Sequence, residues 1–316
     1  MNTLRSCNTL NQSPNYSFEP LLSDAQAAEL LSIHPKTLQR LAREGAADRL
    51  MRRTWGALLA LGLLLARPDR ARADEADPHA VTPERPSVAT DVHTVAAGWT
   101  EIEFGVEDDW FAADEHTLIS TGLGKLGLTP RVELDLTPTR QRSWSEGVSQ
   151  AGFGDLTAGL KWRALDHSRT LGSFAVLPSV KFPTGSVDKG TGTGTTDVSM
   201  LLISSSTFRT VSFDANLGYT HRFGPLVNTT RNSTLWAASS GLPLWGATVC
   251  LEMFGYPGTG GVNGASPSVA VLYGVQLTPR PWLETDVAFI TPVEGRQPHA
   301  VLAGFVWNVG QLWKTR

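Results

Sequence analysis

The feature that most constrains this chain is a hydrophobic period of two residues that recurs through its C-terminal part. In residues 155–163, Leu156, Ala158, Leu160 and Trp162 alternate with Thr157, Gly159, Lys161 and Arg163. A period of two is the side-chain period of a β-strand, whereas a helix repeats every 3.6 residues. About twelve such segments follow one another, near 99–106, 116–126, 131–137, 154–164, 173–182, 197–205, 211–222, 233–241, 245–254, 267–277, 281–290 and 299–309. The pattern predicts an all-β protein.

The connections between these segments nearly alternate between short and long. Tight gaps lie at 127–130, 207–210, 242–244 and 278–280, and longer gaps include 138–152 and 183–196. Bacterial transmembrane barrels show this pattern, because their periplasmic turns are short and their extracellular loops are long. Aromatic residues on the apolar phase also suit membrane interfaces. We therefore expect an antiparallel transmembrane β-barrel of about 12 strands over residues 99–309, with a soluble β-sandwich or lipocalin-like barrel as the alternative.

The charged side chains of these segments fall on the phase opposite the apolar residues. A charge that faces lipid is costly, so we expect the following residues to face the lumen: Glu101, Glu103, Arg131, Glu133, Asp135, Lys161, Arg163, Lys181, Asp214, Arg222, Glu252, Glu284 and Asp286. Two interpretations remain open. The charges either line an aqueous path, or pair across strands and fill a narrow barrel. Both signs are present, so no ion selectivity is predicted.

A secretory signal peptide is predicted at residues 51–73, inside the chain instead of at its start. Arg52 and Arg53 precede an apolar run at 55–66, and Ala71-Arg72-Ala73 offers a small-x-small cleavage site. The apolar run is shorter than the roughly 20 residues of a membrane-spanning helix. Cleavage after Ala73 would leave a periplasmic N-terminal lead at 74–98, the barrel at 99–309 and a C-terminal tail at 310–316. The strands behind the signal predict the outer membrane.

Three blocks of the strand region, at 152–163, 176–185 and 213–220, carry a family resemblance. They resemble the outer-membrane transporters of the MetA-pathway of phenol degradation family, loosely from 83 to 309. The resemblance implies passage or binding of small, often aromatic, solutes, with outer-membrane lipid and the barrel-assembly machinery as partners. Barrels of this type usually end on an aromatic residue that closes the last strand. Here a tail follows Val309, and Trp313 is the candidate substitute.

No catalytic, metal or cofactor motif emerges from the chain. The seven histidines lack metal-site spacing, and the glycine-rich stretch 183–196 lacks the Gly-Lys-Ser/Thr ending of a phosphate loop. His221 and His299 have no recognisable serine partner of the kind that outer-membrane hydrolases use. We expect no enzyme activity, cofactor or metal.

Residues 1–50 contain a separate helical pattern. Ser23 can cap a first helix, Pro35 suits the first turn of a second, and Gly45 ends it. Residues 22–45 resemble the helix-turn-helix of excisionase-type and MerR-like proteins. The resemblance implies that DNA would be contacted by Lys36, Thr37, Gln39, Arg40 and Arg43. The β-wing of that family is missing, because the signal peptide follows directly.

Three functional hypotheses follow. The leading one is an outer-membrane, porin-like barrel for transport or binding of small solutes. The second is a closed structural barrel without transport. The third is a DNA-binding protein that acts through residues 22–45. Under the first two, residues 1–50 are a truncated segment that reflects a misplaced start codon or a gene fusion, or else an unrelated helix pair.

Overall fold

The computed structural model describes residues 77–112, 115–145, 147–168, 172–226, 230–257 and 267–314. These residues belong to the second of two compact units, Arg70–Arg316. The predicted signal peptide at 51–73, the helix-turn-helix-like segment at 1–50 and its five candidate DNA contacts lie outside the described residues.

The described part of the chain is built from antiparallel strands joined by turns and loops. In chain order the strands are β1 (Trp99–Ala112), β2 (Glu115–Thr129), β3 (Val132–Thr137), β4 (Thr139–Ser145), β5 (Val148–Phe153), β6 (Leu156–Ser168), β7 (Gly172–Phe182), β8 (Thr196–Phe208), β9 (Val211–Phe223), β10 (Asn232–Leu244), β11 (Ala247–Tyr256), β12 (Ser268–Arg280), β13 (Leu283–Glu294) and β14 (His299–Gln311). Among these residues there is no helix long and apolar enough to cross a membrane.

The sheet closes on itself because β1 pairs with β14 on one side and with β2 on the other. β3 and β4 pair with successive parts of β2, so they act as one wall strand interrupted at Pro138. β5 and β6 continue the wall in the same way opposite β4 and β3. Over the described residues the barrel therefore has 12 strands, which confirms the predicted fold class.

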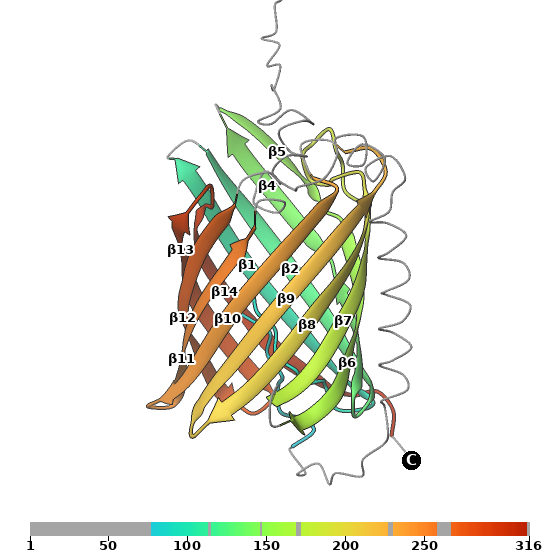
Figure 1. Cartoon of the computed structure of the whole chain (residues 1–316), viewed down its shortest axis with the longest axis vertical. Helices are drawn as coiled ribbons and strands as arrows, with labels where there is room; N and C mark the ends of the chain where they lie inside the picture. The colour runs from blue at the N-terminus through green and yellow to red at the C-terminus, as the bar shows by residue number, and fades with distance from the viewer. Residues whose placement is uncertain are drawn as a thin grey trace, which may run out of the picture. The chain divides into compact units, whose positions relative to one another are not determined.

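The interval 138–152, expected to be a long loop, is instead a hairpin of β4 and β5 that extends the wall (Figure 1). Its sequence, with Arg140, Gln141, Arg142 and Ser143 in succession, is polar on both faces. Strand pairing needs no apolar side chain where both faces meet water, so the hydrophobic period disappears while the strands continue. The expectation of a long loop at 138–152 was therefore wrong, because these residues form two paired strands that extend the wall.

The two ends of the barrel carry different connections. Two-residue turns follow β2, β8, β10 and β12, at one end of the barrel. The β4–β5 hairpin and the loop 183–195 lie at the other end (Figure 1). We call these the turn end and the loop end. Residues 77–98 enter the barrel from the turn end, where β1 begins.

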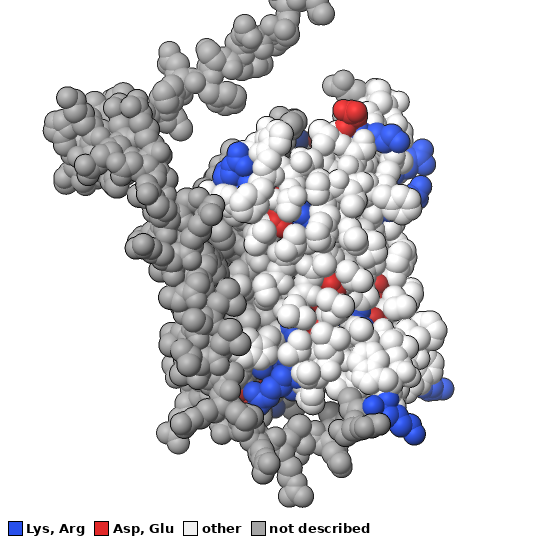
Figure 2. Space-filling model, turned by 90° about the vertical axis from the view of Figure 1, so that its right-hand side faces the viewer, with Lys and Arg blue, Asp and Glu red and all other residues white. Residues whose placement is uncertain are grey.

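The outer surface is apolar and the interior is charged. Leu217 on β9 is 62% exposed, whereas Glu101 on β1 and Lys161 on β6 are 0% exposed. In Figure 2 the middle of the visible face is mostly uncharged, and Lys and Arg side chains gather towards its two ends. A soluble sandwich or lipocalin-like barrel would place its apolar residues inside. The observed distribution is the reverse, as hydrocarbon surroundings require.

Candidate functional site

The candidate functional site is the barrel interior, which is occupied by residues 77–98 of the chain itself. This stretch, the luminal segment, runs from Pro78, held by Asn308 of β14, to Val95, whose N–H donates to Glu133 Oε2 of β3 at 2.5 Å. Figure 1 shows it as the cyan coil within the lower part of the barrel. The sequence predicted a periplasmic lead for this region. The structure instead places its described residues in the interior of the barrel, surrounded by the wall.

Proline explains why the luminal segment crosses the interior without joining the sheet. Pro78, Pro83 and Pro86 lack the N–H that a strand ladder needs. Backbone N–H groups of the segment that are removed from water must find acceptors elsewhere. Most of the acceptors are side chains of the wall.

Wall carboxylates and amides accept most of these bonds. The N–H of Thr82 donates to Glu101 Oε2 and that of Glu84 to Glu103 Oε1, both at 2.9 Å. Further along, Glu252 Oε1 accepts from Ala89 at 3.0 Å. Asn216 exchanges two hydrogen bonds with the backbone of Thr90, at 2.8 and 2.9 Å. The wall therefore recognises the backbone of the luminal segment as a ligand.

Two buried lysines connect the wall and the segment electrostatically. Lys125 Nζ of β2 lies 2.7 Å from Glu101 Oε1 and 2.7 Å from Glu103 Oε1, and it donates to the carbonyl of Thr82. Lys161 Nζ of β6 contacts Glu84 of the segment, Glu133 Oε1 at 3.3 Å and the carbonyl of His93 at 3.1 Å. Each ammonium thus serves the wall and the segment together.

Arg85 is the one arginine of the luminal segment, and it pairs with Asp286 of β13. Its Nε and Nη2 donate to Asp286 Oδ2 and Oδ1, each at 3.2 Å. The guanidinium lies against the inner face of the wall where Gly105 of β1 pairs with Gly304 of β14. Neither glycine has a side chain to fill this space. A Cβ at Gly105 would lie 1.9 Å from Arg85 Nη1, and one at Gly304 would lie 2.4 Å from Arg85 Nε. Only glycine at both positions leaves room for this contact.

The thirteen residues that the sequence placed in the lumen fall into three groups. Eight are buried: Glu101, Glu103, Glu133, Asp135, Lys161, Glu252, Glu284 and Asp286. Of these, Glu101, Glu103, Glu133, Lys161, Glu252 and Asp286 contact the luminal segment. Glu284 Oε2 accepts from Thr278, and Asp135 has no hydrogen-bond partner for Oδ1.

The other five are only partly buried. Arg131 and Arg163 pair with Asp166 near the turn end. Lys181 and Arg222 share Asp197 towards the loop end. Asp214 accepts from Ser205 Oγ at 2.5 Å.

Charge also fixes the ionisation of the luminal segment. Burial raises the pKa of Glu84, but the ammonium groups of Lys161 and Lys125 outweigh it and lower the pKa overall. Burial likewise raises the pKa of Asp91, yet its hydrogen bond with His93 lowers the value to about 2. Glu84 and Asp91 are therefore ionised at neutral pH.

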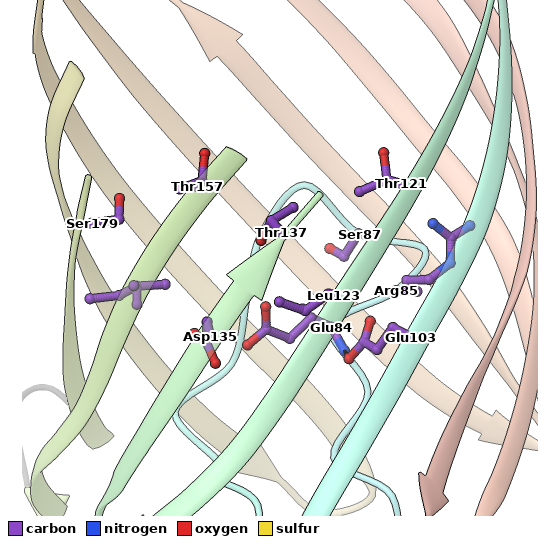
Figure 3. A pocket seen from close by; sticks show the side chains of 12 residues that line it. Glu84, Arg85, Ser87, Glu103, Thr121, Leu123, Asp135, Thr137, Thr157 and Ser179 are labelled. Atoms are coloured by element: carbon purple, nitrogen blue, oxygen red, sulfur yellow. Dashed lines mark hydrogen bonds between the residues drawn. The ribbon is translucent and has the colours of Figure 1, made fainter. Parts of the chain in front are cut away.

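Two cavities flank the luminal segment. The first, about 290 Å³, lies towards the loop end and is lined by the wall residues Thr121, Thr137, Thr157 and Ser179. The second, about 250 Å³, lies towards the turn end beside Ser212, Thr248 and Glu284. Glu84, Arg85 and Ser87 line both cavities. Figure 3 shows these three side chains at the floor of the first cavity, with Glu84 near Asp135 and Arg85 directed away from it.

Part of the lumen is apolar, which the sequence analysis did not anticipate. Ala89 of the segment belongs to a buried cluster with Phe254, Leu272, Ile290 and Leu302 of the wall. A second, smaller cluster joins Val92 to Ala175 and Ile203. Apolar burial therefore adds to the polar contacts that hold the segment.

Sequence reasoning also missed Glu84, Arg85, Gly105 and Gly304. The first two lie before the alternating region, and a glycine in a strand gives no sign of what approaches it. One signal was present. So many charges on the inner phase of a narrow barrel require partners, and the stretch before β1 carries both signs of charge.

Comparison with known proteins found solved outer-membrane proteins that this chain resembles. The chain resembles the COG4313 outer membrane channel from Pseudomonas putida F1, with 12% identity and a TM-score of 0.52 over 69% of this chain and 97% of that one. It also resembles the KdgM porin in complex with disordered oligogalacturonate, with 9% identity and a TM-score of 0.44 over 66% and 98%. A search of curated proteins gave no match.

A family model covers the luminal segment from Glu84 and the wall as far as Pro243. It does not reach residues 22–45, so the helix-turn-helix resemblance gains no support from it. The matched range, 84–243, is half of the chain. The chain belongs to the family described as "Putative MetA-pathway of phenol degradation".

Proposed function

We propose that this protein is an outer-membrane barrel that passes small solutes and that the luminal segment is its barrier. The observation that carries the proposal is the pair of cavities that face opposite ends of the barrel and share Glu84, Arg85 and Ser87 as a common wall. A filled structural barrel would need no such spaces. Displacement of residues 84–87 would join the cavities into one path.

The size and lining of the cavities fit small organic solutes. A cavity of about 150 Å³ accommodates benzene, and the two cavities here measure about 290 and 250 Å³. Leu123 and Leu177 give the first cavity an apolar side next to its threonine hydroxyls. A phenol-sized ring with one polar group would match this mixture. An aromatic solute is therefore our proposed substrate class, as the family description also suggests.

The apolar outer surface supports lipid as the immediate partner, and the signal at 51–73 supports export with cleavage after Ala73. The end of the chain supports recognition by the barrel-assembly machinery. Trp313 follows β14 and donates its backbone N–H to the carbonyl of Gly98, where β1 begins. Trp313 is 41% exposed, so its side chain is available at the closing seam, where an assembly signal would be read.

The test is solute flux through proteoliposomes that contain the full chain. Deletion of residues 83–91 should raise the swelling rate with phenol and with small sugars, because it removes the shared wall of the cavities. Asp188→Asn, which changes an exposed charge in the loop 183–195, is the matched control and should leave the rate unchanged. Equal, background swelling for the wild type and the deletion would contradict the proposal and favour a closed structural barrel.

A further inference from the structure

An acidic cluster joins the luminal segment to β3. Glu84 of the segment and Glu133 and Asp135 of β3 each offer a carboxylate oxygen, and these oxygens all lie within 4.8 Å of one another. Glu133 is 0% exposed and Asp135 is 5% exposed. Three carboxylates this close repel one another unless a positive charge lies between them.

The lysines nearby do not supply enough positive charge. Lys161 forms ion pairs with Glu84 and Glu133, and Lys125 forms ion pairs with Glu101 and Glu103. Five carboxylates therefore share two ammonium groups in this layer. The one arginine of the segment, Arg85, is bound to Asp286 on the other side. A divalent cation would reduce the excess of three negative charges to one.

Asp135 is the carboxylate that the wall leaves without a partner. Its cross-strand neighbour on β6 is Gly159, which has no side chain, and its neighbour on β2 is Lys125. The Lys125 ammonium contacts Glu101 and Glu103 instead. As a result Asp135 Oδ1 is buried without a hydrogen bond.

A second unpartnered oxygen lies outside the cluster, on the same cavity. Glu103 Oε2 is buried without a hydrogen bond, and Glu103 lines the 290 Å³ cavity together with Glu84 and Asp135. In Figure 3 Glu84 lies between Asp135 and Glu103. The cavity gives an ion room for the water ligands that carboxylates alone do not provide. Buried charges in proteins are paired or coordinate metals.

We propose that Glu84, Glu133 and Asp135 form a binding site for one divalent cation, which ties the luminal segment to the barrel wall. Carboxylate and water oxygens are the ligands that Ca²⁺ prefers, and its irregular coordination suits a site built from two separate chain segments. No histidine or cysteine takes part in the cluster, so the donor set does not favour Zn²⁺ or Cu²⁺.

The direct test is calorimetric titration of CaCl₂ into the EDTA-treated full chain in detergent. The wild type should bind one Ca²⁺ per chain. Glu84→Gln and Asp135→Asn should each weaken binding roughly tenfold or more, because affinity depends on the number of charged ligands. The matched control is Glu284→Gln, a buried luminal carboxylate with its own unpartnered Oε1, which should bind as the wild type does.

Two outcomes would overturn the proposal: no Ca²⁺ binding by the wild type, or equal loss of binding in Glu284→Gln. Heat-modifiable migration on gels shows that each variant retains its barrel, and Glu84→Gln changes a coil residue outside the wall. Ca²⁺ should also lower solute flux in the wild type but not in Glu84→Gln. That consequence alone rests on the proposed function. Binding without any flux would leave the cation site standing and contradict the transport proposal.

Discussion

Arg85 and Asp286 are 201 residues apart in the chain, yet the guanidinium of one donates to both carboxylate oxygens of the other, each at 3.2 Å. Asp286 has a fully buried side chain and Arg85 is 16% exposed. A two-pronged arginine–carboxylate contact fixes orientation as well as distance. It holds the part of the luminal segment that separates the two cavities.

Asp286→Asn should loosen the luminal segment. Removing one partner of a buried ion pair leaves the other charge without compensation, which costs roughly 3 kcal/mol or more. If that cost falls on the state in which the luminal segment is bound to the wall, the population with the segment released rises by roughly a hundredfold. Hydrogen–deuterium exchange of residues 82–92 should accelerate while exchange in the wall strands stays unchanged.

The double variant Arg85→Gln/Asp286→Asn supplies the control for that experiment. Two neutral amides can bond to each other without a buried charge, so exchange should slow again relative to Asp286→Asn alone. If the double variant exchanges as fast as the single one, the pair does not hold the segment.

Gly105→Ala should displace Arg85 without unfolding the barrel. The new methyl group would lie 1.9 Å from Arg85 Nη1, at the end of a flexible side chain that can move away. The loss of the Asp286 contact should then reproduce the faster exchange of residues 82–92. Gly122→Ala is the matched control, because its Cβ would meet Pro138 Cγ at an ordinary 3.5 Å. Equal exchange in the two variants would show that the luminal segment does not need the space beside Gly105 and Gly304 to bind the wall.

Much of the barrel wall was predictable because lipid and lumen impose opposite demands on alternate residues. In β9, for example, Leu217 faces outward and Asn216 is buried inside. Where that contrast ends, as at Arg140 to Ser143 in the β4–β5 hairpin, the strands continue without a detectable period.

The luminal segment was not predictable from a period, because it has none. Its position depends on contacts such as those of Glu84 with Lys161 and of Thr90 with Asn216, which join residues far apart in the chain. Charge on the inner phase indicated that partners were needed. It did not identify them as the chain's own N-terminal stretch.

Acidification should release the loop 183–195 through Asp155, which lies between β5 and β6. Burial raises the pKa of Asp155, but hydrogen bonds from Lys181 Nζ and from the N–H groups of Thr193 and Gly185 outweigh it and lower the pKa below 3.8. A lowered folded-state pKa means that the stabilisation is complete above pH 3.8 and is lost as the pH falls through the folded value. Exchange of the loop amides, corrected for intrinsic rate, should therefore increase on acidification below about pH 4.

At neutral pH, Asp155→Asn should have the same effect as acid. Trypsin should cleave after Lys189 in this loop faster than in the wild type, whereas Glu294→Gln, which neutralises an exposed carboxylate at the end of β13, should leave the rate unchanged. A loop that stays protected in Asp155→Asn would show that Asp155 does not anchor it.

Leu217→Arg should prevent insertion of the barrel into lipid. Leu217 is 62% exposed at the centre of β9, and an arginine facing the bilayer midplane costs about 2–4 kcal/mol. The control is Leu244→Arg at the turn end of β10, where the same charge costs only about 0–1 kcal/mol near the interface. Refolding into lipid vesicles, followed by heat-modifiable gel migration, should give a lower folded fraction for Leu217→Arg only. In a soluble barrel both arginines would meet water and both variants would fold equally, so equal yields would contradict the membrane assignment.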